Sequence, residues 1–274
     1  MSHLRSRFTT SATTAAVFLG VLIGAAVLAP VLAPFAADAL DLAHRRGPPS
    51  IAHWFGTDEL GRDVLTRVLF GARVSLAIGL ISAMVSVSVG VMIGAVAGYG
   101  SRWVDDLLMR MTDAMLAVPR LPLLMILAAV LQPRVPVLIL LVGAAGWMET
   151  ARVARAEVRS IAARDFVQGA RAIGASPLRV LVHHVLPGIV PAASVACTLA
   201  IGRGILLESA LSFFGVGVQP PTASWGNMLY QAQTTMTTEP WLAIFPGAFI
   251  FLTVLACNAM GDLIGATPEM ARER

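Results

Sequence analysis

The sequence predicts an all-α membrane protein with six transmembrane helices. Of its 274 residues, 57% are hydrophobic and only 13% are charged, whereas soluble domains carry about 25% charged residues. Long uncharged runs recur along the chain, separated by segments that hold most of the charges. Because about 20 apolar residues suffice for a helix to cross the core of a bilayer, each long run is a candidate span.

The first predicted span is the uncharged run from Phe8 to Ala37. A cleaved signal peptide is the alternative, because such peptides also carry an apolar stretch near the N-terminus. A mixed polar loop follows over Asp38 to Arg73. From Thr57 onward its apolar residues recur on one helical face, and Asp63 with Arg67 has the i, i+4 spacing of an ion pair. We expect an amphipathic helix here, either at the membrane surface or packed on the bundle.

The second and third spans differ in how regular they are expected to be. The second runs from Val74 to Ser101, and its glycines at 79, 90, 94 and 98 allow close helix approach. A short charged connection follows over Arg102 to Asp113. The third span, Ala114 to Pro133, carries Arg120 between two prolines, so it is expected to be kinked and to give the arginine a partner or water.

The remaining spans are predicted from three further apolar runs. The fourth, Val135 to Met148, is short and is expected to extend past Glu149, with a buried or re-entrant segment as the alternative. The fifth opens at Gly188 and continues towards Phe214, and the sixth is Trp241 to Gly261. The loop between them, Ser212 to Pro240, is rich in Gly, Pro and Thr. Aromatic residues in and beside it are expected to anchor at the membrane interface: Trp225, Tyr230 and Trp241.

The segment from Phe166 to Pro187 is predicted to form two short helices around a tight turn. Gly174 suits the left-handed position that ends a helix, Ser176 suits the N-cap of the next helix, and Pro177 suits its first position. An apolar face on the second helix is expected from Leu178, Leu181, Val182 and Val185. The transmembrane runs on both sides argue against a DNA-binding helix-turn-helix, which needs a soluble basic surface.

The distribution of arginine predicts the orientation. With the N-terminus inside, cytoplasmic segments hold twelve arginines and outer segments hold six. The positive-inside rule therefore places both termini and the segment from Phe166 to Pro187 in the cytoplasm. The six arginines at 152, 155, 159, 164, 171 and 179 contribute most to this bias, and those at 152, 155 and 159 are interpreted as a face near lipid headgroups.

Composition also limits the chemistry that the chain can perform. All 20 basic residues are Arg, so the chain has no lysine for an ordinary phosphate-binding P-loop. If ATP drives the protein, another subunit must bind it. Cys197 and Cys257 lie in apolar runs and are interpreted as packing residues. His183 and His184 are adjacent and lack the i, i+4 spacing that metal ligands on a helix prefer.

Three separated stretches resemble one family of membrane proteins. FVQGARAIGASPLRVLVHHVLP resembles the EAA loop of ABC-importer permeases, with Gln168 and Gly169 replacing the usual Glu and Ala. GTDELGRDVLTRVLFGARVSL and LESALSFFGVGVQPPTASWGNML are similar to signatures of the dipeptide/oligopeptide/nickel group, specifically its C-type permease. GYGSRWVDDLLMRMTDAMLAVP extends the resemblance over about residues 10 to 265.

The resemblance implies a type I ABC-importer permease fold in which the EAA-like loop is a coupling helix. That helix would dock on a cytoplasmic ATPase and carry its closing motion into the membrane. Small residues at 169, 170 and 174 would let the ATPase approach closely. The resemblance assigns to this loop Phe166, Gln168, Gly169, Ala170, Gly174, Ala175, Ser176, Pro177, Leu178, Leu186 and Pro187.

The resemblance also implies partners and a location. The partners would be a second homologous permease, two ATPase subunits or one fused ATPase that bind ATP and Mg, and a periplasmic or lipid-anchored solute-binding protein. The chain would lie in the bacterial cytoplasmic membrane among lipid, with no cofactor, nucleic acid or catalysis of its own. The outer loops over 38–73 and 212–240 would contact the binding protein.

The predicted organisation has three parts. Residues 1–73 hold the first helix and a periplasmic loop, 74–265 form the permease core with the coupling loop at about 150–187, and 266–274 form a cytoplasmic tail. The cargo is expected to be a dipeptide or oligopeptide, with nickel or another metal chelate as the alternative. A secondary transporter is the alternative from another class, and it would be expected to show inverted repeats and acidic relays.

Ionisable residues inside predicted spans are candidates for the transport pathway or its gate. These residues are Arg120, Arg203 and Glu208. Arg203 and Glu208 are five residues apart, about 140° around a helix, so they are not expected to pair with each other. Structural pairing at helix interfaces is the alternative role for all three.

Overall fold

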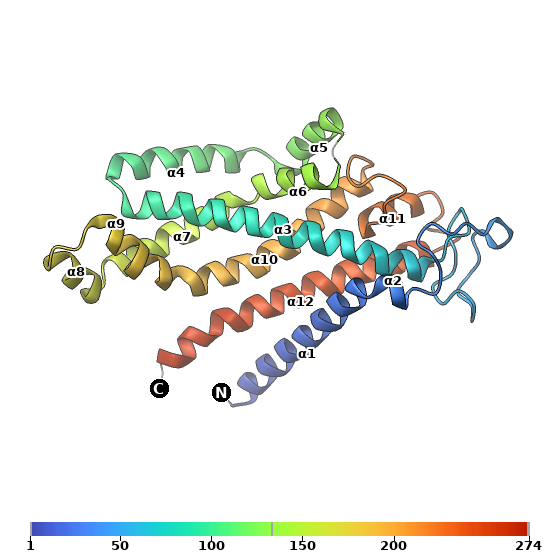
Figure 1. The fold of residues 1–274 in the computed structure, drawn as a ribbon, viewed down its shortest axis with the longest axis horizontal. Coiled ribbons are helices and arrows are strands. Elements are labelled where there is room, and N and C mark those ends of the chain that lie inside the picture. The colour runs from blue at the N-terminus through green and yellow to red at the C-terminus, as the bar shows by residue number, and fades with distance from the viewer. Residues whose placement is uncertain (1, 133, 273–274) are drawn as a thin grey trace.

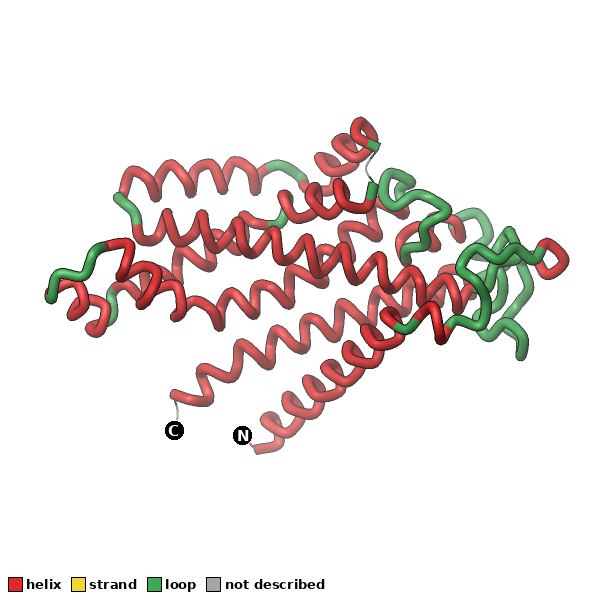
Figure 2. Tube along the Cα trace, in the orientation of Figure 1, coloured by secondary structure: helices red, strands yellow, loops and turns green. Residues whose placement is uncertain are grey.

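A computed structural model describes residues 2–132 and 134–272, with side chains described over 12–132 and 134–265. Within these ranges the chain folds into an elongated bundle whose helices run lengthwise (Figure 1). The helices make up most of the chain, and the longer loops gather at the end opposite the two termini (Figure 2). Both termini lie near the end that carries α8 and α9, as the six-span prediction requires (Figure 1).

The elements alternate between long helices and short segments at the ends of the bundle. In chain order they are α1 (Ser2–Val27), α2 (Ala29–Leu32), the 3₁₀ turn η1 (Leu42–His44), α3 (Val64–Tyr99), α4 (Arg102–Ala117), α5 (Arg120–Leu131), α6 (Val135–Ala144), α7 (Trp147–Ala162), α8 (Asp165–Ala172), α9 (Pro177–Val180), the π-helical segment η2 (Leu181–Val185), α10 (Leu186–Phe213), α11 (Trp225–Ala232) and α12 (Trp241–Arg272).

The six predicted spans each find a counterpart among the described helices. Three helices are long and apolar enough to cross a membrane: Val64–Tyr99, Pro177–Phe213 and Trp241–Gly265. Two pairs of helices are also long and apolar enough to cross a membrane if each bent pair is taken as one span: α4 with α5, and α6 with α7. The apolar part of α1, Ala12–Val27, is shorter. It packs against α12 and α3 as part of the bundle.

The prediction was wrong about where the second span begins. α3 starts at Val64 and continues without a break to Tyr99, so no separate surface helix precedes it. Arg67 is buried there, and it approaches Asp58 rather than Asp63, with 3.6 Å between its Nε and the Asp58 carboxylate. Asp63 instead accepts a hydrogen bond from the backbone N–H of Thr66 and caps the helix. Arg67 also donates to the side-chain oxygen of Gln231, while its Nη1 has no hydrogen-bond partner among the described residues.

The third and fourth spans are both bent. α4 already begins at Arg102, where a charged connection was predicted, and it meets α5 at an angle of 80°. The expected kink lies at Val118 and Pro119, directly before Arg120. α6 and α7 meet at 44° around Gly146, so the fourth span continues past Met148 through α7.

Glycines of α3 allow two other helices to approach closely, as predicted. A Cβ on Gly94 would lie 2.5 Å from the carbonyl oxygen of Ala151 in α7. A Cβ on Gly79 would lie 2.5 Å from the side chain of Ile205 in α10. Larger residues at these positions would force the helices apart.

The segment over 212–240 is more ordered than the predicted loop. It contains α11, which packs against α10 and α12. Trp225 begins this helix and is fully buried, so its predicted place at the membrane interface is wrong. Tyr230 is about half exposed. At the other end of the chain, the predicted tail continues the helix α12 as far as Arg272, and the last two residues lie outside the described part.

Candidate functional site

The turn between α8 and α9 has the backbone geometry that its sequence predicts. Gly174 follows the C-cap of α8 with φ of +88°, in the left-handed region. Its N–H donates to the carbonyl of Arg171 at 3.0 Å, and the N–H of Ala175 donates to the carbonyl of Ala170 at 3.1 Å. These two bonds form a Schellman motif, which ends α8 without leaving its last carbonyls unpaired.

The second helix of the loop begins as predicted but does not stop before the fifth span. Pro177 occupies the first position of α9, although the Ser176 side chain makes no cap hydrogen bond, contrary to expectation. The chain then continues through η2 into α10 as one helical rod. The wider π-helical turn ends at Val185, one turn or less before Pro187, which has no N–H to donate and would otherwise crowd the carbonyl of His183.

Internal contacts hold α8 and α9 to the bundle. Gln168 donates a hydrogen bond from Nε2 to the carbonyl of Ala162, 2.8 Å away, at the end of α7. The guanidinium of Arg171 lies 4.9 Å from the centre of the Tyr99 ring at the end of α3. Four buried side chains of the loop join a core cluster with α3, α7 and α10: Val167, Ala170, Val180 and Val185.

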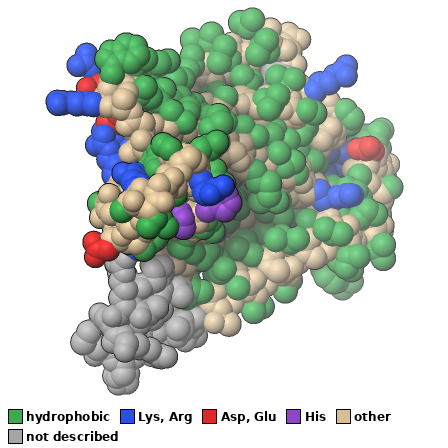
Figure 3. Space-filling model, turned by 60° about the vertical axis from the view of Figure 1, so that its left-hand side comes forward, with side chains coloured by type: hydrophobic (Ala, Val, Ile, Leu, Met, Phe, Trp, Pro, Cys, Tyr) green, Lys and Arg blue, Asp and Glu red, His purple; other side chains and the backbone are tan. Residues whose placement is uncertain are grey.

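Several apolar side chains of the loop point away from that cluster. Ile173 is 88% exposed, Leu178 is 70% exposed and Phe166 is 54% exposed. A Cβ built on Gly169 meets no atom within 4 Å. Figure 3 turns this end of the molecule forward and shows hydrophobic, basic and histidine side chains on it. We call Phe166, Gly169, Ile173 and Leu178 the loop surface.

Some of the predicted coupling residues pack against the rest of the chain, and others are exposed. Ala170 is buried, while Ala175 and Leu186 pack partly buried on the same core cluster, so these three contact the chain itself. The predicted apolar face also divides, because Leu178 and Val182 are exposed while Val185 is buried. Ile173, the most exposed apolar residue of the loop, was not predicted because it lies between the two helices and belongs to neither periodic face.

The two predicted membrane-embedded arginines share one partner that sequence reasoning did not select. Arg120 donates from Nη2 to Oε1 of Glu149 at 2.8 Å, and Arg203 binds the other carboxylate oxygen. Arg120 starts α5 and Glu149 lies in the first turn of α7, each directly after a bend. The cluster thus joins both broken spans to α10. The sequence feature that could have identified Glu149 is its position directly after the uncharged run over 135–148.

Glu208 lies elsewhere and is fully buried. Its carboxylate accepts hydrogen bonds from three serine hydroxyls, one each on α3, α10 and the N-cap of α11: Ser75 at 3.1 Å, Ser212 at 2.7 Å and Ser224 at 2.8 Å. This geometry favours the structural alternative for Glu208, because the carboxylate is enclosed by its own chain.

The arginines at 152, 155 and 159 pair with α4 rather than only facing headgroups. Arg155 and Arg159 both bind the carboxylate of Asp105, which is 2% exposed. Arg152 binds Asp113, which lies further along α4, at 2.5 Å. These ion pairs join α7 to α4, a role for these arginines that the sequence did not predict.

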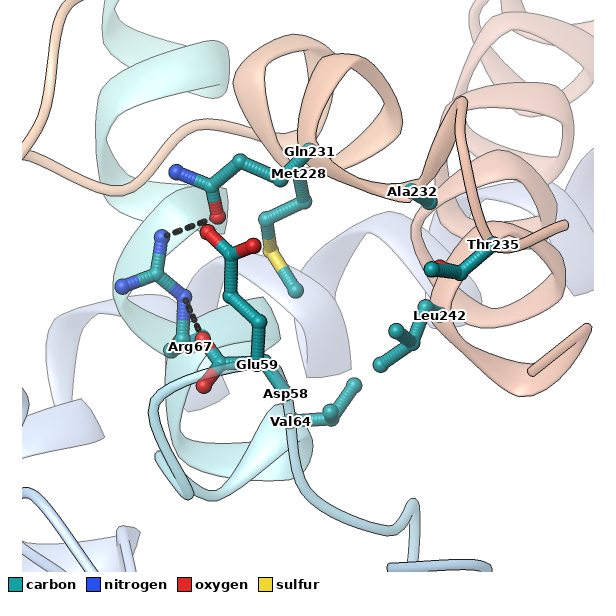
Figure 4. A pocket seen from close by; sticks show the side chains of 9 residues that line it. All are labelled: Asp58, Glu59, Val64, Arg67, Met228, Gln231, Ala232, Thr235 and Leu242. Carbon is teal, nitrogen blue, oxygen red and sulfur yellow. Dashed lines mark hydrogen bonds and ion pairs between the residues drawn. The ribbon is translucent and has the colours of Figure 1, made fainter. Parts of the chain in front are cut away.

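The opposite end of the bundle is closed by a polar network. Arg62 and Arg67 each donate to the side-chain oxygen of Gln231 in α11 at 3.3 Å, and Arg62 also binds Asp58 at 2.7 Å. Figure 4 shows Arg67, Asp58 and Gln231 around a small pocket that Met228 and Leu242 also line. The network fixes the motif GTDELGRD against α11. In the loop before this motif, Ile51 and Trp54 are 97% and 69% exposed.

Comparison with known proteins now decides the family. Residues 90–267 match the family described as "Binding-protein-dependent transport system inner membrane component". The chain belongs to this family. It is also 38% identical to a Brucella suis protein named "Putative peptide permease protein", over 81% of this chain and 74% of the relative. The glutathione transport system permease protein of Escherichia coli O6:K15:H31 is 40% identical over 83% of this chain and 75% of its own length.

Family membership confirms the predicted resemblance to ABC-importer permeases and the multi-pass membrane fold. It also overturns the secondary-transporter alternative, because the family serves binding-protein-dependent transport. The chain is therefore a transport permease.

Proposed function

We propose that this permease forms part of the membrane pathway of an ATP-driven importer for peptides or peptide-like solutes. The names of the relatives refer to peptides and to glutathione, which favours this cargo over the metal-chelate alternative. The working complex would add a second permease, ATPase subunits that bind ATP and Mg, and a solute-binding protein. The chain itself would carry no catalytic group and hold no cofactor.

The loop surface is the observation that carries the ATPase-coupling part of the proposal. Its exposed apolar residues suit burial against another protein, because such side chains gain from leaving water. Its anchors are internal, since Val167 and Val180 are buried against α7 and α10. α9 continues directly into α10, so a displacement of the loop would move a whole span as a rigid rod.

The same geometry, together with the arginine distribution, supports a proposed orientation. The loop surface and both termini share one end of the bundle (Figure 1). That end would face the cytoplasm, where the ATPases reside. The opposite end, where the exposed Ile51 and Trp54 belong to the loop before α3, would face the bacterial cell exterior or periplasm and receive the binding protein.

One pair of substitutions tests both contacts together. Ile173→Asp places a charge on the loop surface and should abolish co-purification of the ATPase subunits. Ile51→Asp places the same charge at the other end, so the ATPases should co-purify normally while the binding protein no longer stimulates ATP hydrolysis. Retention of the ATPases by Ile173→Asp, in a complex that still contains both permeases, would refute the coupling assignment.

The cargo is tested on the wild-type complex in proteoliposomes. A library of tripeptides is added with the binding protein, and ATP-dependent uptake is measured by mass spectrometry. Uptake of tripeptides is the expected result. Uptake of nickel chelates without any tripeptide would replace the peptide proposal with the metal-chelate alternative.

A further inference from the structure

The Arg120–Glu149–Arg203 cluster has an excess of one positive charge within the membrane-spanning part of the bundle. Two guanidinium groups share a single carboxylate, so the formal charge of the cluster is +1. Guanidinium groups stay protonated in proteins, so this charge does not disappear by titration. The cluster therefore attracts anionic groups that reach its exposed side.

The cluster is not enclosed by its own chain. The side chains of Arg203 and Glu149 are 41% and 42% exposed, and that of Arg120 is 23% exposed. Charged groups at this depth are costly to place against hydrocarbon. The exposed side of the cluster must therefore face water or a partner protein rather than lipid tails, and a water-filled pathway satisfies this requirement.

A small cavity adjoins the cluster and contains further polar groups. It is lined by residues of α3, α5, α6, α10 and the bend before α7, including Ser86, Arg120, Gly146 and Arg203. Ser86 is 3% exposed, and its hydroxyl has no hydrogen-bond partner within the described chain. This hydroxyl is therefore available to a water molecule or to a polar group of a bound solute.

The position of the cavity corresponds to the middle of the bundle. Ser82 and Ser86 lie close to the centre of α3, and the N-terminal ends of α5 and α7 reach the cavity at Arg120 and Gly146. Helix N-termini at breaks within spans carry a partial positive charge that favours anions. Lipid phosphates lie at the membrane surface, so they are poorly placed to reach a site at this depth.

We propose that this cluster is a transit site for the carboxylate of the transported solute, with Arg203 and Arg120 as its ligands and Ser86 as an additional donor. Two arginines that share one carboxylate have donors to spare for a second, and the planar guanidinium matches carboxylate geometry. A peptide with a free C-terminus supplies one such carboxylate. This proposal rests on the proposed function, because it requires that the chain transports peptides.

The test compares tripeptides with free C-termini against the same tripeptides with amidated C-termini. Both libraries are used at concentrations that load the binding protein equally, and ATP-dependent uptake into proteoliposomes is measured for the complete complex. The ratio of acid to amide uptake is then compared between variants, so that a preference of the binding protein cancels. Arg203→Gln and Arg120→Gln should each lower this ratio at least fivefold. Arg73→Gln, an exposed arginine of α3 outside the cluster, should leave it unchanged.

A triple variant separates ligand binding from a purely structural cluster of ion pairs. Glu149→Gln combined with Arg120→Gln and Arg203→Gln removes all three charges of the cluster and leaves none of them unpaired. A structural role predicts that this variant recovers uptake of both libraries with the wild-type ratio, and that result would overturn the proposal. A transit site predicts that assembly recovers while the preference for the acid stays lost. If the wild-type complex takes up no tripeptide at all, the proposed function itself fails.

Discussion

The indole nitrogen of Trp225 in α11 donates a hydrogen bond to the carbonyl oxygen of Val68 in α3, 3.1 Å away. The backbone N–H of the same tryptophan donates to the hydroxyl of Ser75 at 3.2 Å. One fully buried side chain thus joins a short helix to the start of the longest one. Because Ser75 and Ser224 also bind Glu208, the contact belongs to a polar network across α3, α10 and α11.

We expect Trp225→Ala to lower the free energy of unfolding by roughly 3–5 kcal/mol, the usual cost of removing a large buried aromatic side chain. Thermal unfolding of the purified complex in detergent measures the effect. Tyr230→Ala in the same helix is the control, because Tyr230 is about half exposed. Equal melting temperatures for the two variants would show that the buried contact does not stabilise the fold.

Helix approach at Gly94 gives a second stability prediction. Gly94→Leu should prevent α3 and α7 from packing, because even a Cβ there would lie 2.5 Å from the carbonyl oxygen of Ala151. Overpacking of this kind costs at least roughly 1–3 kcal/mol. Yield and melting temperature of the purified chain are the measurements. Gly20→Leu on α1, where a Cβ meets nothing within 4 Å, should behave like the wild type.

The ion pairs between α4 and α7 make a third prediction that depends on burial. Asp105→Asn should destabilise the complex by roughly 1.5–3 kcal/mol, the range for hydrogen bonds to charged groups, because it leaves two arginines without their carboxylate. Asp113→Asn should cost less than about 1 kcal/mol, because the Asp113–Arg152 pair is exposed. Thermal unfolding at low and high salt compares them. A larger loss for Asp113→Asn would contradict the burial argument.

Local sequence signals predicted those features of the fold that depend on neighbouring residues. The sequence Gly174-Ala-Ser-Pro177 predicted the turn because a left-handed residue and an N1 proline are requirements of the backbone itself. The glycines of α3 predicted close packing because small residues have few other roles in a span.

Features that depend on distant residues were not predictable in the same way. The partner of Arg203 is Glu149, separated by 54 residues, and only the packing of α7 on α10 brings them together. Arg67 made the start of α3 look like part of a surface loop, since one of its two partners, Gln231, is 164 residues away. A charge that finds its partner through tertiary structure carries no local signal of being buried.

The backbone at Gly174 leads to the final prediction, which concerns coupling. Gly174→Val should uncouple ATP hydrolysis from uptake, because a β-branched residue at φ of +88° costs roughly 1–2 kcal/mol and shifts the turn between α8 and α9. Substrate-stimulated ATP hydrolysis and uptake are measured together in proteoliposomes. Insertion and assembly should be preserved, because a Cβ on Gly174 meets no atom within 4 Å.

Two matched variants show whether the backbone or the added side chain causes the effect. Gly174→Asn should retain coupling, because asparagine tolerates the left-handed conformation better than other residues. Gly169→Ala adds a methyl group on the exposed face of α8 without backbone strain, so it should affect only the approach of the ATPase. Normal stimulated hydrolysis together with normal uptake in Gly174→Val would show that the geometry of this turn does not transmit the motion of the ATPase.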